Sequence, residues 1–159
     1  MDVLAVHADR TPAAPALIDG DRRLTWREYV AQRNRLANAL RGLGLTKGEH
    51  AIVYVQNSLE AVLVPSAARS AGAIPVPINH RLVADEVAYI LDHSDARAVF
   101  VSDAFLGTVE RVRPGAGKVR SWILVGASGG HGPSTSTTCS RKVTRHRSPP
   151  IRRRGSAAR

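Results

Sequence analysis

Apolar and polar positions over the first 126 residues follow two alternating rhythms, one typical of strands and one typical of helices. Four short apolar runs rich in Val, Ile and Ala predict strands, at residues 50–55, 73–78, 96–103 and 121–126. Segments with apolar residues at helical spacing lie between them, at residues 58–72, 84–94 and, more weakly, 104–112. Strands that alternate with helices predict an α/β fold with a parallel sheet covered by helices.

The residues before the first of these strands have a different pattern. Residues 3–9 can form a short helix, and "PALIDGDRRLTW" predicts two brief strands around the turn "DGD". A longer helix is expected to begin at Thr25, because "TWRE" is a capping box in which Thr25 and Glu28 satisfy exposed amides. Gly42 and Gly44 are expected to end it.

Prolines interrupt two of the predicted elements. Pro65 lies inside the helix predicted after Ser58, where a proline kinks or breaks a helix at a cost of about 3 kcal/mol. Pro75 and Pro77 lie in the apolar run 73–78 and favour a strand at the edge of the sheet or a strand end, because proline has no N–H to donate.

The net charge of +10 is concentrated at one end of the chain. Residues 131–159 contain eight Lys and Arg and no acid, whereas the first 130 residues have 15 basic and 13 acidic side chains. Residues 127–159 are rich in Ser, Pro and Arg and offer almost nothing to bury, which predicts a disordered tail. The chain therefore divides into a domain over residues 1–126 and a basic tail over residues 127–159.

Cysteine content and hydropathy restrict the location of the protein. Cys139 is the only cysteine, which excludes a disulfide framework and a thiolate metal site. The longest apolar run is far shorter than the roughly 20 residues that a membrane-spanning helix needs. Residues 1–12 carry Asp2 and lack a basic segment before an apolar one, so they do not look like a secretory signal. A cytoplasmic protein without a membrane span is expected.

A set of motifs in this order resembles the adenylate-forming acid–CoA ligases, the superfamily that also holds the adenylation domains of peptide synthetases. The motifs are "LTWREY", "NRLANALRGLG", "KG", "NS" and "AGAIPVPIN", and the resemblance runs from about Ala8 to about Val125. It implies that residues 1–126 are a partial, helix-covered subdomain of a larger adenylating-enzyme N-terminal domain. It also implies an ATP-, Mg²⁺- and coenzyme A-dependent activity on a carboxylic acid of the fatty-acid type, through an acyl-adenylate.

The family's phosphate loop reads Thr-Ser-Gly-Thr-Thr-Gly-x-Pro-Lys-Gly, and "STSTTCSRKV", Ser134–Val143, imitates it. The imitation contains no glycine and no proline before Lys142, and glycine is what lets the backbone approach a phosphate closely. We therefore expect no catalytic residue and no cofactor in this chain, which should be inactive alone. Residues 127–159 also have the composition of an out-of-frame read through GC-rich coding DNA, which is a hypothesis about their origin.

The loop Asn79, His80 and Arg81 is the candidate binding site, because the corresponding loop of some relatives lies near the nucleotide part of coenzyme A. A strand-to-helix turn with exposed side chains is the alternative. Val83 follows where relatives often place a threonine that caps the next helix, and the missing cap should cost about 1 kcal/mol.

Two further clusters have a functional and a structural interpretation. Gly42, Gly44 and Gly48 can be a nucleotide-binding turn, but their place before a strand favours a helix stop followed by a turn. "LDHSD", with Asp92, His93 and Asp95, can be a metal cluster, but a helix end leading into a strand is favoured and no metal is expected.

Three functions therefore remain open for the whole chain. The first is an inert N-terminal piece of an acid–CoA ligase that self-associates through uncovered apolar surface. The second is a non-enzymatic binding protein whose tail contacts nucleic acid or an anionic surface, although "RRR", Arg152–Arg154, lacks interleaved aromatic residues and nucleic acid is not the favoured partner. The third is a protein that complements a separately encoded remainder of the ligase.

Overall fold

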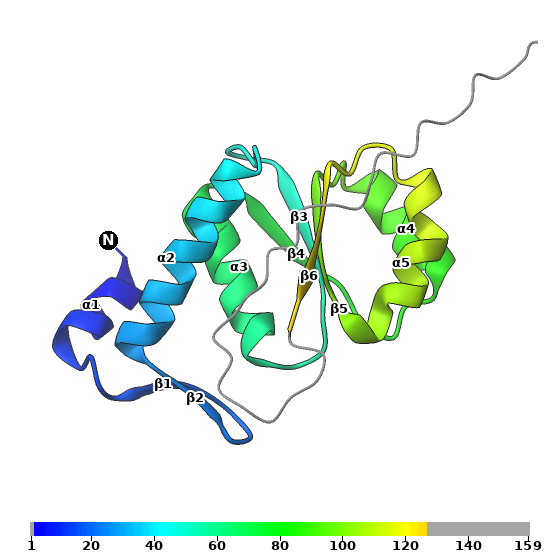
Figure 1. Cartoon of the computed structure of the whole chain (residues 1–159). Coiled ribbons are helices and arrows are strands. Elements are labelled where there is room, and N and C mark those ends of the chain that lie inside the picture. The colour runs from blue at the N-terminus through cyan, green and yellow to red at the C-terminus, as the bar shows by residue number, and fades with distance from the viewer. Residues whose placement is uncertain (1, 127–159) are drawn as a thin grey trace, which may run out of the picture.

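The structure is a computed structural model that describes residues 2–126. The N-terminal part contains a helix, a hairpin and a long helix: α1 (Val3–Arg10), β1 (Pro15–Asp19), β2 (Arg22–Thr25) and α2 (Trp26–Gly42). The alternating part follows: β3 (His50–Tyr54), α3 (Leu59–Ala71), β4 (Ile74–Pro77), α4 (Ala84–His93), β5 (Ala98–Ser102), α5 (Leu106–Val112) and β6 (Ser121–Val125). Figure 1 shows their arrangement. Short 3₁₀ turns flank α5, at Asp103–Phe105 and Arg113–Gly115.

Each helix and strand that the sequence pattern predicts is present in the described residues. The predicted tail 127–159, the segment Ser134–Val143, Cys139 and the run Arg152–Arg154 lie outside the described residues.

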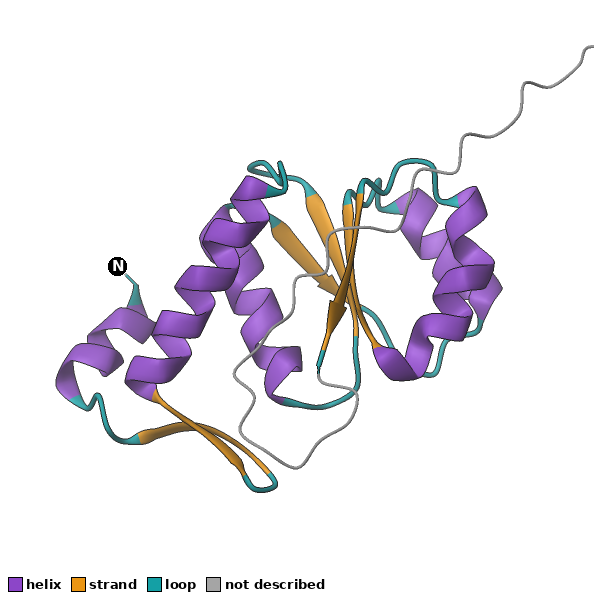
Figure 2. Cartoon of the chain, in the orientation of Figure 1, coloured by secondary structure: helices purple, strands orange, loops and turns teal. Residues whose placement is uncertain are grey.

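Strands β3 to β6 form a parallel sheet in the order β4-β3-β5-β6. Helices α2 and α3 cover one face of this sheet and α4 and α5 cover the other, as Figures 1 and 2 show with the sheet seen edge-on. The predicted α/β fold with a helix-covered parallel sheet is therefore confirmed.

The two faces of the sheet form two separate hydrophobic cores. On the α2/α3 face, Leu40 and Val64 pack with Phe100 of the central strand β5. On the α4/α5 face, Val87 and Leu91 pack with those residues of β3 and β5 whose side chains point to this side of the sheet. Because successive residues of β5 point to opposite faces and both faces are covered, the strand is apolar from Ala98 to Val101, as its sequence indicates.

The hairpin β1–β2 is antiparallel and turns at Gly20, whose φ of +58° is a conformation that glycine adopts at little cost. Arg22 joins it to the first turn of α3 by donating to both carboxylate oxygens of Glu60, at 2.7 and 3.0 Å. Burial has the largest single effect on the pKa of the Glu60 carboxyl and raises it, but the hydrogen bonds and charge of Arg22, together with hydrogen bonds from the Glu60 amide and Ser58, leave that pKa below its ordinary value. The hairpin is thus held to the rest of the fold by charge as well as by packing.

Pro65 does not break the predicted helix, because α3 is one continuous helix from Leu59 to Ala71. Pro65 is buried in this helix together with its neighbours Val64 and Ala67. Proline cannot donate to the carbonyl of Ala61, and burial of its ring on the sheet offsets that loss.

Strand β4 confirms the prediction that prolines mark an edge. The amides of Ile74 and Ile78 donate to Glu49 and Val53 of the neighbouring β3 segment, at 2.9 and 3.1 Å. Since alternate residues of a strand face the same neighbour, the nitrogens of Pro75 and Pro77 face the free edge, where no donor is needed.

Helix α4 begins without a side-chain cap, as its sequence indicates. Val83 is its N-cap residue, has no side-chain hydrogen bond there and is 62% exposed. The carboxylate of Glu86 accepts a hydrogen bond from the Val83 amide at 3.0 Å, so half of a capping box remains.

The sequence analysis did not identify an ion pair near the N-terminus, between a buried arginine and an exposed aspartate. The guanidinium of Arg33 in α2 is almost fully buried and donates to both carboxylate oxygens of Asp2, at 2.9 and 2.6 Å, and to Asn34 Oδ1. Asp2 also caps α1, because its Oδ1 accepts hydrogen bonds from the amides of Leu4 and Ala5. One carboxylate therefore begins α1 and neutralises a buried charge in α2.

We predict that Asp2→Asn lowers the free energy of unfolding by about 1–3 kcal/mol near neutral pH, because asparagine can cap α1 but cannot neutralise Arg33. Hydrogen bonds from Arg33 hold the pKa of Asp2 below its ordinary 3.8, so this stabilisation is present above pH 3.8 and declines as the pH falls further. Urea unfolding, followed by circular dichroism near neutral pH and below pH 3.8, measures the difference in stability between the wild type and the variant.

Asp9→Asn, at an exposed position of α1, is the matched control and should unfold like the wild type. The wild type and Asp2→Asn should converge in stability at low pH. A difference that stays constant over the whole pH range would contradict the assigned role of the carboxylate.

Candidate functional site at the carboxyl edge of the sheet

The carboxyl ends of β3 to β6 lie at one edge of the sheet because the strands are parallel. The chain passes from β3 to β4 on one side and then returns to place β5 on the other side of β3. This reversal makes a topological switch point between β3 and β5, where open α/β sheets bind their ligands. The segments that leave β3, β4 and β5 at this edge are therefore the candidate site.

Ser102 ends β5 beside the switch point. Its Oγ is buried and has no hydrogen-bond partner among residues 2–126. Buried hydroxyl groups nearly always have a partner, so this one marks a polar position in an otherwise apolar strand end. The sequence analysis did not select Ser102, although a serine after the apolar run "AVFV" is the signal that identifies it.

Asn79, His80 and Arg81 form the turn that follows β4 at the same edge. The Asn79 side chain accepts a hydrogen bond from the Arg81 amide at 2.9 Å, and its carbonyl accepts one from Leu82 at 3.2 Å. This closes a tight turn in which Asn79 and Arg81 are exposed and His80 is half-buried. The structure thus places all three predicted residues in a single turn at the carboxyl edge of the sheet.

Aromatic rings connect this turn to the neighbouring strands. The His80 ring stacks on Phe105, in the 3₁₀ turn after β5, with centroids 6.2 Å apart. Phe105 also contacts Tyr54 at the end of β3, with centroids 4.4 Å apart, and the Tyr54 hydroxyl donates to the Leu82 carbonyl at 3.2 Å. The end of β3 and the segment after β5 therefore hold the 79–82 turn in place.

Sequence reasoning selected His80 but missed Tyr54 and Phe105. The sequence pattern identifies the segments of both rings only as a strand or a weak helix. The two rings lie near the His80 turn because the strand order of the sheet places their segments beside it. Tyr54 is fully buried and Phe105 is half-buried, so these two rings support the turn from inside the fold, whereas Arg81 of the same turn is exposed. An exposed guanidinium can bind an anionic group such as a phosphate.

The glycine-rich segment 42–48 lies at the other edge of the sheet, before β3. Gly44 and Gly48 have φ of +81° and +84°, and the Gly48 amide donates to the Gly72 carbonyl at 2.9 Å. The interpretation as a helix stop followed by a turn is confirmed, because α2 ends at Gly42 and the segment leads into β3.

The "LDHSD" segment has its carboxylates engaged by a lysine. Lys118 Nζ lies 2.8 Å from an oxygen of Asp92 and 2.8 Å from an oxygen of Asp95, and its hydrogen bond lowers the pKa of Asp95. His93 stacks on Tyr89 with ring centroids 5.4 Å apart. Within residues 2–126 no group of three or more His, Cys, Asp or Glu side chains is placed to hold a metal ion.

Comparison with known proteins identifies the family. The family model described as "AMP-binding enzyme" matches residues 4–151. The chain belongs to this family. The matched span extends past residue 126, so the domain boundary there and the out-of-frame origin of residues 127–159 stay predictions.

Individual relatives agree with this assignment. The chain is 35% identical over 123 residues to a medium/long-chain-fatty-acid–CoA/3-oxocholest-4-en-26-oate–CoA ligase of Mycobacterium marinum, covering 77% of this chain and 22% of the relative. It is 33% identical over 106 residues to the fatty acid–[acyl-carrier-protein] ligase ScoC of Streptomyces coeruleorubidus, covering 67% of this chain and 20% of the relative.

The fold matches a solved N-terminal domain, that of FACL13 from Mycobacterium tuberculosis. The TM-score is 0.73 at 31% identity, over 77% of this chain and 32% of that domain. The chain thus spans about a fifth of the length of the curated relatives that it matches and about a third of this domain. In residues 2–126 no helix is both long and apolar enough to cross a membrane.

We predict that Tyr54→Phe lowers the free energy of unfolding by about 0.5–1.5 kcal/mol, because the Leu82 carbonyl loses its donor while the ring contact with Phe105 stays. The 79–82 turn should also exchange its amide hydrogens faster. Urea unfolding and hydrogen exchange measure the two effects. Tyr89→Phe, at a tyrosine that is 66% exposed, should change neither. Equal losses in both variants would contradict the anchoring role of Tyr54.

Proposed function

We propose that this chain provides the N-terminal part of an ATP-dependent acid–CoA ligase that acts on a fatty acid in the cytoplasm. The family match over residues 4–151, together with 35% identity to a fatty-acid–CoA ligase, supports this function best. Such an enzyme joins the acid to AMP and then transfers the acyl group to the thiol of coenzyme A. Adenylation is needed because a carboxylate is a poor electrophile.

We propose further that the chain is inactive alone. Transfer at the α-phosphorus requires amides, a cation and Mg²⁺ around the phosphates. Residues 2–126 supply a sheet edge, aromatic rings and one turn, while Ser134–Val143 lacks the glycines of a phosphate loop. ATP and Mg²⁺ therefore belong to the remainder of the ligase, and this chain needs no cofactor of its own.

The turn at Asn79, His80 and Arg81 is our proposed contact for coenzyme A. Arg81 is exposed and can pair with a phosphate, and the stacked rings of His80 and Phe105 lie beside it. The contact forms only when the rest of the ligase holds the pantetheine arm. Asn79 fixes the turn rather than the ligand, because its side chain already accepts from the Arg81 amide.

We predict that the purified chain catalyses no ATP–pyrophosphate exchange above background with a medium-chain fatty acid and Mg²⁺. A full-length fatty-acid–CoA ligase assayed in parallel is the positive control. Exchange above background that Lys142→Ala abolishes would contradict the prediction and identify Ser134–Val143 as a working phosphate loop. Restored exchange on adding the chain to a relative without its matched segment would support complementation of a separate remainder.

The charge of residues 131–159 supports a second candidate function, a binding protein for nucleic acid or another anionic surface. Eight basic residues without an acid bind phosphates with an affinity that falls steeply as salt is added. We expect only weak binding to RNA or DNA at physiological salt, because the segment has no aromatic residue to stack on a base. Fluorescence anisotropy over a salt series measures it. Tight binding that disappears on deletion of residues 131–159 would establish this function instead.

A further inference from the structure

The two edges of the parallel sheet differ in what they offer to another strand. At the β4 edge the outward nitrogens belong to Pro75 and Pro77, which cannot donate a hydrogen bond. At the β6 edge the strand reads "SWILV", with no proline and no charge. Natural proteins usually block a free edge with prolines, charges or bulges, and β6 has none of these.

The backbone of β6 shows which groups face outward. The Arg97 carbonyl, just before β5, accepts from the amides of Arg120 at 2.9 Å and Ser121 at 3.2 Å, and Ser121 is the first residue of β6 that pairs with β5. Because alternate residues of a strand face the same neighbour, Ser121, Ile123 and Val125 face β5. The N–H and C=O groups of Trp122 and Leu124 therefore face the free edge. Among residues 2–126 no strand pairs with that edge.

We propose that two copies of this chain associate through β6, pairing edge to edge as antiparallel strands. With Ile123 of both copies at the two-fold axis, Trp122 lies opposite Leu124 of the second copy. These are hydrogen-bonded pairs in which each residue donates and accepts, so the outward groups of both strands form four hydrogen bonds. The two four-stranded sheets become one continuous sheet of eight strands.

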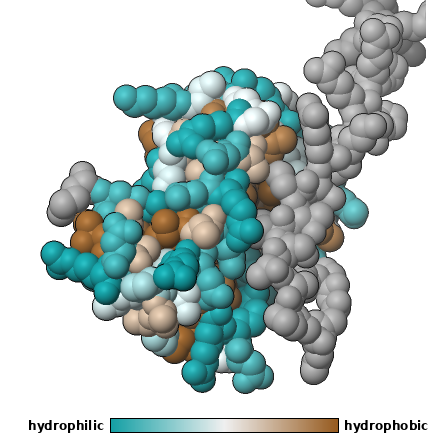
Figure 3. Space-filling view, turned by 60° about the vertical axis from the view of Figure 1, so that its left-hand side comes forward, coloured by the Kyte–Doolittle hydropathy of each residue, from teal (hydrophilic) through white to brown (hydrophobic). Residues whose placement is uncertain are grey.

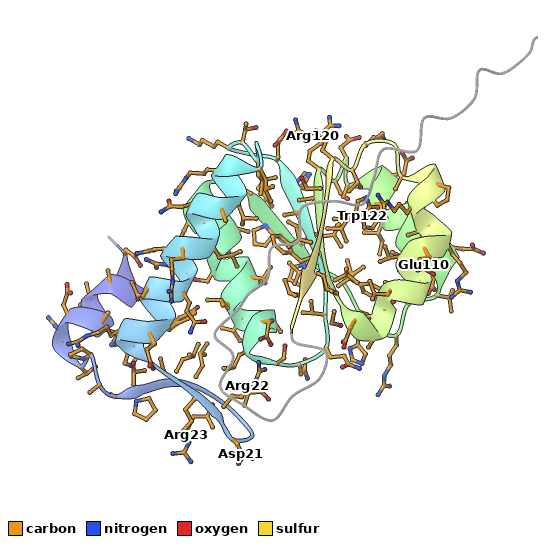
Figure 4. All side chains as sticks on the ribbon, viewed as in Figure 1. Asp21, Arg22, Arg23, Glu110, Arg120 and Trp122 are labelled. Carbon is orange, nitrogen blue, oxygen red and sulfur yellow. The ribbon has the colours of Figure 1, made fainter. Side chains whose placement is uncertain are left out.

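Side chains and charges favour this arrangement. Figure 4 shows the indole of Trp122 on the side of β6 toward α4 and α5, where Trp122 and Leu124 pack on the core of that face. Antiparallel pairing places this ring beside the leucine of the second copy, an apolar cross-strand contact. It also places Arg120 opposite a glycine, Gly126, whereas parallel in-register pairing would place Arg120 beside Arg120. The guanidinium of Arg120 is paired with Glu49 of its own chain, and the antiparallel form keeps the two ion pairs apart.

A second copy fits this edge better than the chain's own C-terminal residues do. Residues 127–159 contain no aromatic residue, and Val143 and Ile151 are their only large aliphatic ones, so their composition does not favour a strand. The face that Figure 3 brings forward carries hydrophobic groups in small areas between hydrophilic ones, which offers no comparable apolar surface there. Strand pairing at one edge buries little surface, so the dimer should be reversible and depend on concentration.

The first test compares Leu124→Pro with Leu124→Ala by analytical ultracentrifugation over a range of concentrations. Both variants lose the same apolar contact, but only proline removes the outward N–H, at a position equivalent to the prolines of β4. The wild type should reach twice the 17.1 kDa of one chain, Leu124→Ala should dimerise more weakly, and Leu124→Pro should stay monomeric. Circular dichroism checks that both variants fold.

The second test uses the two-fold axis, in a background with Cys139→Ser so that no other thiol is present. Ile123→Cys places two thiols opposite each other at a non-hydrogen-bonded pair, and mild oxidation should give a covalent dimer. Trp122→Cys is the control. It should not cross-link, because position 122 lies opposite position 124 of the second copy, and the two introduced thiols are therefore two residues apart along the paired strands.

Three results would overturn the proposal. A wild-type chain that stays monomeric at all concentrations would leave this edge to a different protein, such as the remainder of a ligase. Leu124→Pro that dimerises as well as Leu124→Ala would assign the contact to another surface. Ile123→Cys that cross-links no better than Trp122→Cys would exclude the two-fold register. None of these measurements uses ligase activity, so their results test the dimer independently of the proposed function.

Discussion

The central strands β3 and β5 must be shielded from water on both faces, and the rest of the structure depends on this constraint. Val53 and Phe100 point to one face and Ile52 and Val99 to the other, all almost fully buried. Only helices on both sides of the sheet can cover such strands. Helices α2 and α3 therefore take one face and α4 and α5 take the other, so the connections between strands are also the cover of the core.

The same constraint puts all the strand-to-helix turns at one edge, because every crossover in a parallel sheet leaves from the carboxyl ends. Tyr54, His80 and Phe105 meet there although they lie far apart in the chain. The glycine-rich segment 42–48 and the Asp92–Asp95 segment serve the opposite edge, where they end helices and lead into strands. Position relative to the sheet thus separates a candidate binding turn from structural turns of similar composition.

The two edges of the sheet also differ from each other. Prolines close the β4 edge, while β6 leaves the backbone groups of Trp122 and Leu124 available. Relatives of this family extend far beyond the span matched here.

Hydrophobic spacing, capping motifs and turn residues in the sequence determine the elements and their order, because these signals act over a few neighbouring residues. They also placed Asn79, His80 and Arg81 in one turn and Pro75 and Pro77 on an edge. Only tertiary structure decided that Arg33 is buried against Asp2, that α3 continues through Pro65, and that Tyr54 and Phe105 support His80. The reason is physical: each depends on the tertiary environment of a residue, whose free energy local sequence does not contain.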